Sequence, residues 1–238
     1  MEKEGSNKKR AIAKDSRLIE LLFSWSLEDI SNNDLYRNQV ERIPETFGTA
    51  GHYFGSYIFP LLEEIRAEMC SSMEDIHSAP FAEVTSFDES KPYGSLLYDV
   101  KVDNWRNRFS DRGKEPYKTL PGDILILTDA KPETVSDLQR VGRTWTFASV
   151  TRIPDDENED NSSSTYFKVK ISKEYEVNDE KQRSMFVIFL INIVTNKRIW
   201  NALHMCGNMS IISEVLSSDS LVSNVNKLNI SIQLCIHY

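Results

Sequence analysis

The sequence predicts an α+β fold in which helices flank a single antiparallel β-structure. Before Phe81, apolar residues recur at the spacing of amphipathic helices. From Phe81 onward, short segments rich in Val, Ile, Thr, Phe and Tyr alternate with clusters of Gly, Pro, Asp and Ser. Six such segments in about 115 residues have the spacing of an antiparallel barrel or sandwich rather than of repeated βαβ units.

Two amphipathic helices are predicted before the strands. Asp15 or Ser16 can cap the first, which runs to about Ile30. The second lies in HYFGSYIFPLLEEIRAEMCSSMEDI, where Pro60 suits the first turn because its missing N–H costs nothing there. The apolar positions that define the two helices are Leu18, Ile19, Leu22, Phe23, Trp25 and Leu27 in the first, and Leu61, Leu62, Ile65, Met69 and Met73 in the second.

The six predicted strands are AEVTSF, SLLYDVKVDNW, DILILTDA, RTWTFASVTRI, TYFKVKIS and SMFVIFLINIV. The acidic run DDENEDNSSS between Pro154 and Thr165 is interpreted as a solvated hairpin loop. After the last strand, TNKRIWNALHM indicates a turn that leads into a helix. The final segment, VNKLNISIQLCIHY, has no clear period or cap.

Composition limits the classes of function. An apolar content of 40% is enough to fill a core, and a net charge of -8 argues against nucleic-acid contact over a whole face, so any such contact is local. Cys70, Cys206 and Cys235 show no paired spacing, which predicts neither a disulfide framework nor a zinc site.

The N-terminal segment MEKEGSNKKRAIAKDSR is charged, and no run approaches the roughly 20 apolar residues that cross a bilayer. We therefore expect no membrane partner and no secretion. The basic cluster from Lys8 to Arg10 could belong to a nuclear-localisation signal, although a solvated tail is the simpler interpretation. We expect a nuclear location, with the cytoplasm as the alternative.

Motifs of catalysis are missing from the sequence. It contains no GxxxxGK followed by Ser or Thr, no GxGxxG, no GxSxG and no HExxH, and its four histidines, His52, His77, His204 and His237, share no motif. Asp99, Lys101 and Asp103 alternate in YDVKVD as in a metal-dependent nuclease, but a solvent-facing strand produces the same alternation. We assign no catalytic residue, no metal site and no cofactor to the chain.

Basic and aromatic residues gather in the β-rich region. In a barrel such residues can pair with phosphates and stack on bases, the usual scheme for binding single strands. The competing interpretation is that Trp105 and Trp145 are core residues and that the arginines pair with nearby acids. The candidates for nucleic-acid contact are Lys101, Trp105, Arg106, Arg108, Lys118, Arg140, Arg143, Trp145, Lys168 and Lys170, and the same concentration includes Arg112, Lys114 and Arg152.

Three segments carry a family resemblance: SYIFPLLEEIRAEMCSSMEDI, YDVKVDNWRNRFSDRGKEPYKTLPGDILILTDAKPETVSDLQRVGRTWTFASVTRI and TNKRIWNALH. Together they resemble the N-terminal part of plant senataxin-like superfamily 1 helicases, a family labelled tRNA-splicing endonuclease positive effector related. The resemblance covers about Asp15 to Val222. In the wider senataxin and nonsense-decay helicase group, a helix similar to the stretch from Tyr57 to Glu64 precedes a barrel. The segments Pro121–Asp123 and Thr195–Leu203 resemble a barrel strand and the helix that leaves the barrel.

In that group an OB-like barrel sits on a helical stalk above the first RecA-like motor domain and helps to grip single-stranded nucleic acid. The resemblance implies a disordered tail at 1–14, a helical stalk at 15–80, an OB-like barrel at 81–197 and a returning stalk helix at 198–222. The family's motor, with its phosphate loop and its ATP and Mg site, would begin soon after Val222. Because this sequence departs from the family at 223–238, we expect a truncated or aberrant tail there, and no motor activity is carried over.

The expected function is therefore that of a non-catalytic accessory region. It would assist the binding of single-stranded RNA or DNA next to an ATP-driven helicase motor, its partner in cis. The alternative is a protein–protein interaction module without nucleic-acid binding. The acidic net charge, the loop DDENEDNSSS and stalk helices that would bare an apolar face without a motor favour this alternative.

Overall fold

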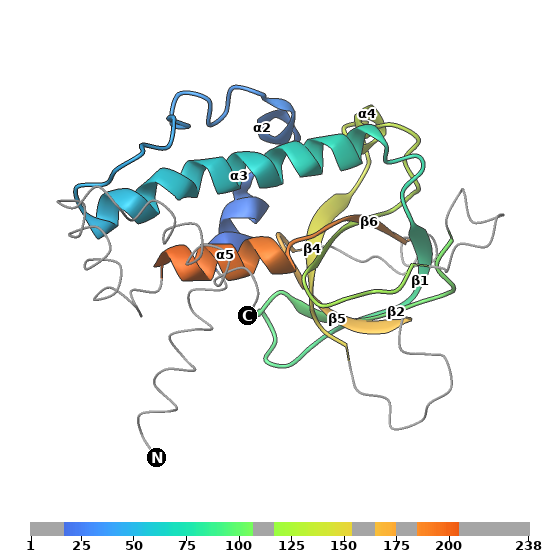
Figure 1. The fold of residues 1–238 in the computed structure, drawn as a ribbon. Coiled ribbons are helices and arrows are strands. Elements are labelled where there is room, and N and C mark those ends of the chain that lie inside the picture. Colours follow the sequence, from blue (N-terminus) through green and yellow to red (C-terminus); the bar gives the residue numbers. More distant parts are fainter. Residues whose placement is uncertain (1–16, 107–116, 154–164, 175–184, 205–238) are drawn as a thin grey trace, which may run out of the picture.

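A closed antiparallel barrel with helices along one side forms the described part of the chain (Figure 1). The computed structural model describes residues 17–106, 117–153, 165–174 and 185–204. The strands follow the order β1-β2-β5-β4-β3-β6, and β6 pairs with β1 to close the barrel. The predicted antiparallel OB-like barrel flanked by helices is confirmed. The strands are β1 (Phe81–Glu89), β2 (Leu97–Val102), β3 (Asp123–Thr128), β4 (Trp145–Arg152), β5 (Tyr166–Ile171) and β6 (Phe186–Asn192).

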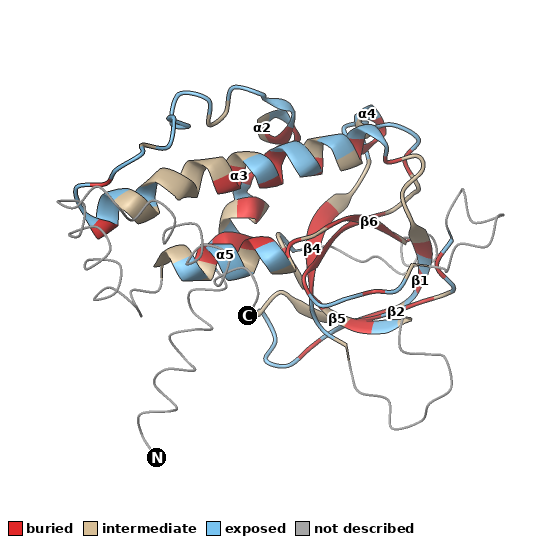
Figure 2. Cartoon of the chain, in the orientation of Figure 1, coloured by how far each residue is buried: buried red, intermediate tan, exposed pale blue. Residues whose placement is uncertain are grey.

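Side chains of β3 alternate between two cores. Leu125 and Leu127 belong to the cluster that fills the barrel, whereas Ile124 and Ile126 pack in the cluster shared with the helices. Because both faces are covered, every residue of β3 is buried. Figure 2 shows buried residues along much of β4 and β6 and on parts of α3 (Ala50–Glu74) and α5 (Val194–His204), whose other residues are intermediate or exposed.

The first predicted helix is interrupted. Residues 17–24 are helical, but Trp25 and Ser26 leave the helix before α2 (Leu27–Ser31) begins. The Ser26 side chain accepts a hydrogen bond from the Asp29 N–H (3.0 Å), and the Ser26 N–H donates to the Asp29 carboxylate (2.8 Å). This capping box starts a new helix, so the prediction of one helix to about Ile30 was wrong.

The second helix begins earlier than predicted. Its N-cap is Thr49, whose hydroxyl accepts a hydrogen bond from the His52 N–H at 3.1 Å, so Pro60 lies inside α3 rather than in its first turn. The Thr49 cap and edge contacts between Phe47 and the ring of Tyr53 (5.0 Å between centroids) extend the helix on the N-terminal side of the proline. The predicted apolar face, which comprises Leu61, Leu62, Ile65, Met69 and Met73, is buried as expected.

A buried arginine fixes α2 against α3. The Arg66 side chain is 3% exposed, and its Nη1 donates to the carbonyl of Ile30 at 2.6 Å. Its other nitrogens bind the side chains of Asn33 (3.2 Å) and Glu63 (2.7 Å). Arg66 thereby satisfies a carbonyl in the last turn of α2 that lacks a partner within that helix.

The returning helix α5 starts at Val194 rather than at Arg198, directly after β6 ends at Asn192. The Asn192 side chain caps it by accepting a hydrogen bond from the Val194 N–H at 3.0 Å. The short helix α4 (Val135–Leu138) lies in the charged connection after β3. Several predicted features lie outside the described residues: the tail with Lys8 to Arg10, the acidic run, Cys206, Cys235, His237 and the segments 205–222 and 223–238.

Candidate nucleic-acid interface

Three predicted lysines share the outer surface of β2 and β5. Lys101 pairs in register with Tyr166, and Lys168 and Lys170 follow Tyr166 at every second residue. Because alternate residues of a strand point to the same side, these four side chains face outward while their neighbours fill the barrel. Arg152 of β4 pairs in register with Lys168. We call this surface the cationic face and define it as Lys101, Arg152, Tyr166, Lys168 and Lys170.

Tyr166 was missed as a candidate in the sequence. Its side chain is 39% exposed, so the ring is accessible to a stacking partner. The sequence feature that could have identified Tyr166 is its alternation with the two lysines in TYFKVKIS, which places the three residues on one side of a strand.

Acidic residues partly neutralise the cationic face. Lys168 Nζ lies 3.2 Å from a carboxylate oxygen of Asp99 and donates to the Ser90 hydroxyl at 3.0 Å. Burial alone would raise the pKa of Asp99, but the hydrogen bonds from Ser90 and Lys168 outweigh it and lower that pKa, so Asp99 is charged at neutral pH. Lys170 lies 3.5 Å from Glu20. Lys101 and Arg152 form no ion pair with another described residue.

The predicted arginines outside the cationic face pair with neighbouring acids. Arg106 contacts Asp103 and lies 3.7 Å from Glu83. Arg140 binds Asp137 at 2.8 Å, and Arg143 lies 3.5 Å from Asp129. The competing interpretation of the sequence, in which arginines pair with nearby acids, therefore describes these three.

The two tryptophan candidates differ in their surroundings. Trp105 is 8% exposed and packs against Tyr117 (4.6 Å between ring centroids) and Phe167 inside the barrel, so its indole is not available to a base in this structure. Trp145 is partly exposed at the start of β4, and Lys173 Nζ lies 5.1 Å from its ring centroid. Lys118 is exposed in the loop before β3, whereas Arg108, Arg112 and Lys114 lie outside the described residues.

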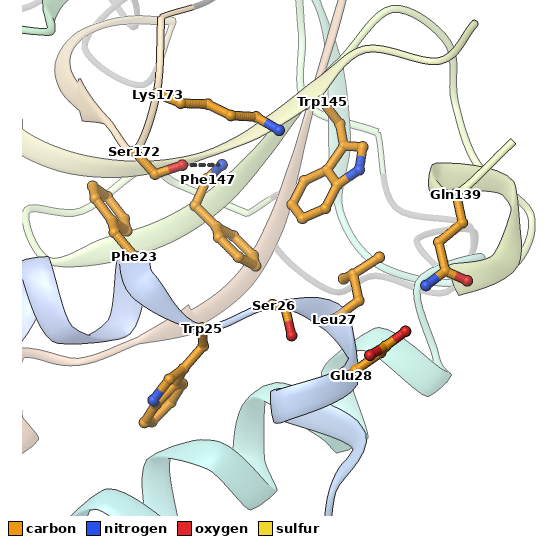
Figure 3. Close-up of a pocket in the computed structure, with 10 residues that line it drawn as sticks. All are labelled: Phe23, Trp25, Ser26, Leu27, Glu28, Gln139, Trp145, Phe147, Ser172 and Lys173. Carbon is orange, nitrogen blue, oxygen red and sulfur yellow. Dashed lines mark hydrogen bonds between the residues drawn. The ribbon is translucent and has the colours of Figure 1, made fainter. Parts of the chain in front are cut away.

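A pocket of about 480 Å³ lies where the N-terminal helical segments meet the barrel (Figure 3). Trp145 and Phe147 of β4 form one wall, and Leu27 of α2 contributes to another. We call it the junction pocket. It is lined by Phe23, Trp25, Ser26, Leu27, Glu28, Gln139, Trp145, Phe147, Ser172 and Lys173.

A buried polar network lies at the PGD segment. The Asp123 side chain accepts hydrogen bonds from the Tyr117 hydroxyl, from the Leu120 N–H (2.7 Å) and from the Asn192 amide (2.6 Å). Burial raises the pKa of both Asp123 and Tyr117, and Asp123 is only 1% exposed. The network joins the loop before β3 to the end of β6 and offers no group to a ligand in solvent.

The two carboxylates of the nuclease interpretation are engaged in separate contacts. Asp99 binds Ser90 and Lys168, and Asp103 accepts a hydrogen bond from the Glu83 N–H at 2.9 Å. Within residues 17–106, 117–153, 165–174 and 185–204, no three His, Cys, Asp or Glu side chains are grouped so that they could hold a metal ion. None of the helices described is both long and apolar enough to span a bilayer.

Comparison with known proteins places the chain in a family without assigning it an activity. A family model described as "Domain of unknown function (DUF6469)" matches residues 14–223. No curated protein matches the sequence. The match includes the whole barrel and all the described helices. The chain therefore belongs to the DUF6469 family.

Proposed function

We propose that this chain is a non-catalytic accessory region of a senataxin-like helicase, in which the barrel helps to bind a single-stranded nucleic acid next to an ATP-driven motor. The observation that carries the proposal is the cationic face on an OB-like barrel. OB-like barrels use an outer strand surface of this kind for oligonucleotides, with cations for the phosphates and rings for the bases. The sequence resemblance to helicases with a barrel on a helical stalk supports the same proposal.

The charges of the cationic face suit a modest affinity. Lys101 and Arg152 have no acidic partner among the described residues, so they are available to phosphates. The ion pairs of Lys168 and Lys170 join partly exposed side chains and are worth roughly 0–1 kcal/mol each, so a phosphate can replace the acid at little cost. The nearby acidic residues limit the number of phosphates that the cationic face can neutralise, which is consistent with the net charge of -8.

The test is the binding of a labelled single-stranded RNA at about 50 mM and about 200 mM salt, since phosphate contacts are strongest at low salt. We expect binding at the lower concentration that weakens steeply at the higher one. The double variant Lys101→Gln, Arg152→Gln should bind more weakly and show a smaller salt slope, by about 0.7 for each lost contact to a single strand. Arg37→Gln, which removes a cation from the loop after α2, is the matched control. No binding of the unmodified chain at low salt would remove the proposal.

A second candidate function is a protein-interaction module. The observation that favours it is the first half of α3, where Tyr53, Phe54 and Tyr57 are only partly buried. Aromatic side chains of this kind are enriched in protein interfaces. If the purified chain is monomeric, monodisperse and does not bind an apolar dye, this candidate loses its support.

A further inference from the structure

We propose that the junction pocket binds one unstacked base of the single strand, with Trp145 as the stacking surface and Lys173 as the contact to the adjoining phosphate. This inference rests on the proposed function and assigns a second subsite to it. The pocket lies outside the cationic face, which supplies phosphate contacts along the outer strands.

The size and walls of the pocket suit a planar ring. Its volume of about 480 Å³ falls within the range of roughly 300–1,000 Å³ that is typical of small-ligand sites. Trp145 and Phe147 come from alternate positions of β4, and their rings meet edge to face with 5.1 Å between centroids. This packing holds the indole in place, so one of its faces can serve as a fixed platform. Phe23 and Leu27 add apolar surface from the helical segments.

The Lys173 ammonium lies over the Trp145 ring, where the proposed base would stack. Its nitrogen lies 5.1 Å from the centroid of the Trp145 ring, and Figure 3 shows the side chain extending toward the indole. Stacking of a base on an aromatic ring contributes more than an exposed cation–π contact, so a base can displace the ammonium. The displaced ammonium remains within reach of the phosphate attached to the same nucleotide.

The rim of the pocket offers groups for the edge of a base. Gln139 presents a side-chain amide with a donor and an acceptor, and Glu28 presents a carboxylate. Figure 3 shows these two side chains on the same side of the pocket. Carboxylates and amides are the side chains that accept from or bond in pairs with exocyclic amines of bases.

Charge and continuity favour a nucleotide over an apolar peptide segment. Arg140 follows Gln139 directly, and its side chain is 69% exposed although it is paired with Asp137. Lys173 lies two residues after the end of β5, the strand that carries Lys168 and Lys170, so the same stretch of chain supplies cations to the cationic face and to the pocket. An aromatic wall with a cation beside it matches a base with its phosphate.

The test compares two ligands of equal length, a single-stranded oligocytidylate, whose bases carry an exocyclic amine, and the same sugar–phosphate chain without bases. The unmodified protein should bind the base-containing strand roughly 5- to 150-fold more tightly, the range that corresponds to one stacked base. Trp145→Leu should lose a large part of this preference without changing the salt slope, and the contribution of Tyr166 on the cationic face should remain. Trp145→Tyr should keep a large part of it, because the phenol ring also stacks. Lys173→Gln, a change at an exposed side chain, should instead reduce the salt slope by about 0.7.

The outcomes separate this inference from the proposed function. If the protein binds both ligands equally, or if Trp145→Leu keeps the full preference for bases, the junction pocket is not a base subsite although the proposed function stands. If the unmodified protein binds neither ligand at low salt, the proposed function itself fails. Should Trp145→Leu not fold, the ligand preference of the unmodified protein and the salt slope of Lys173→Gln still decide the matter.

Discussion

Gly122 is the residue of the PGD segment that no other amino acid can replace without strain. Its φ is +88°, and a Cβ on it would lie 2.5 Å from Cγ2 of Val194. Its N–H donates to the Val150 carbonyl (2.8 Å), and its carbonyl accepts from the Ile193 N–H (3.0 Å). The glycine of the PGD segment is required because Val194, the first residue of α5, packs directly on the backbone of the loop.

Gly122→Ala should therefore lower the free energy of unfolding by about 1–3 kcal/mol, from backbone strain and from the clash with Val194. The matched control is Gly94→Ala, where φ is +77° but nothing lies within 4 Å of the new Cβ. Urea unfolding of the two variants measures the difference. Equal losses would mean that Val194 moves aside without cost.

Asp123 accepts hydrogen bonds on both carboxylate oxygens, so its neutral isostere cannot fit. In Asp123→Asn the amide nitrogen would face the Asn192 amide nitrogen, and Asn192 cannot turn without losing its cap on the Val194 N–H. We expect a loss of about 1–3 kcal/mol in the free energy of unfolding. The double variant Asp123→Asn, Asn192→Asp restores a donor opposite an acceptor and should recover part of this loss. If the double variant is no more stable than Asp123→Asn, the hydrogen bond between residues 123 and 192 does not account for the loss.

The residues of the interface were predictable in part. Lys168 and Lys170 could be placed on one surface because strand alternation is local. The pairing of Arg143 with Asp129 and the burial of Trp105 against Phe167 depend on loops and strands that meet only in the closed barrel. Periodicity carries no information on such contacts, so both residues remained candidates for nucleic acid.

At the scale of elements, hydrogen bonds of single side chains decide where helices begin. The apolar period continues through Trp25 and Leu27, but the capping box at Ser26 divides the helix, and the cap at Thr49 starts α3 well before Pro60. Strands were predicted well because each is a short run rich in β-branched and aromatic residues. Closure of the barrel was not predictable in detail, since Phe81 pairs with Ile188, a residue 107 positions later in the sequence.

Because of the capping box at Ser26, the free energy of unfolding should depend on pH in the acidic range. Hydrogen bonds from the Ser26 N–H and hydroxyl lower the pKa of Asp29 below 3.8, the ordinary value. Because the folded pKa is lower than the unfolded one, the stabilisation is complete above the unfolded pKa and is lost as the pH falls through the folded pKa. Asp29→Asn should flatten this acid limb when unfolding is measured between about pH 5 and about pH 2. Parallel curves for the two proteins would show that the cap does not titrate.

Arg66 connects α2 to α3, and its loss should be costly. Arg66→Leu leaves the Ile30 carbonyl and the Glu63 carboxylate without their partner, so we expect a loss of about 1–3 kcal/mol in the free energy of unfolding. Arg37→Leu removes an arginine whose ion pair with Asp34 is largely exposed, and should change stability by less than about 1 kcal/mol. Urea denaturation compares the two variants. A similar small effect in both would mean that water replaces Arg66 at the end of α2.

For the whole molecule, the two cores make the helices and the barrel one cooperative unit. Neighbouring residues of β3 enter both clusters, so neither core can be exposed while the other stays intact. Met69→Ala in α3 and Leu127→Ala inside the barrel should therefore each destabilise the same transition, by about 2–5 kcal/mol. Denaturant unfolding followed by far-UV and near-UV circular dichroism should give one coincident transition in each variant, with an unchanged slope. Two transitions, of which each variant shifts only one, would show instead that the helices can separate from the barrel. That separation would also open the junction pocket, whose walls come from both parts.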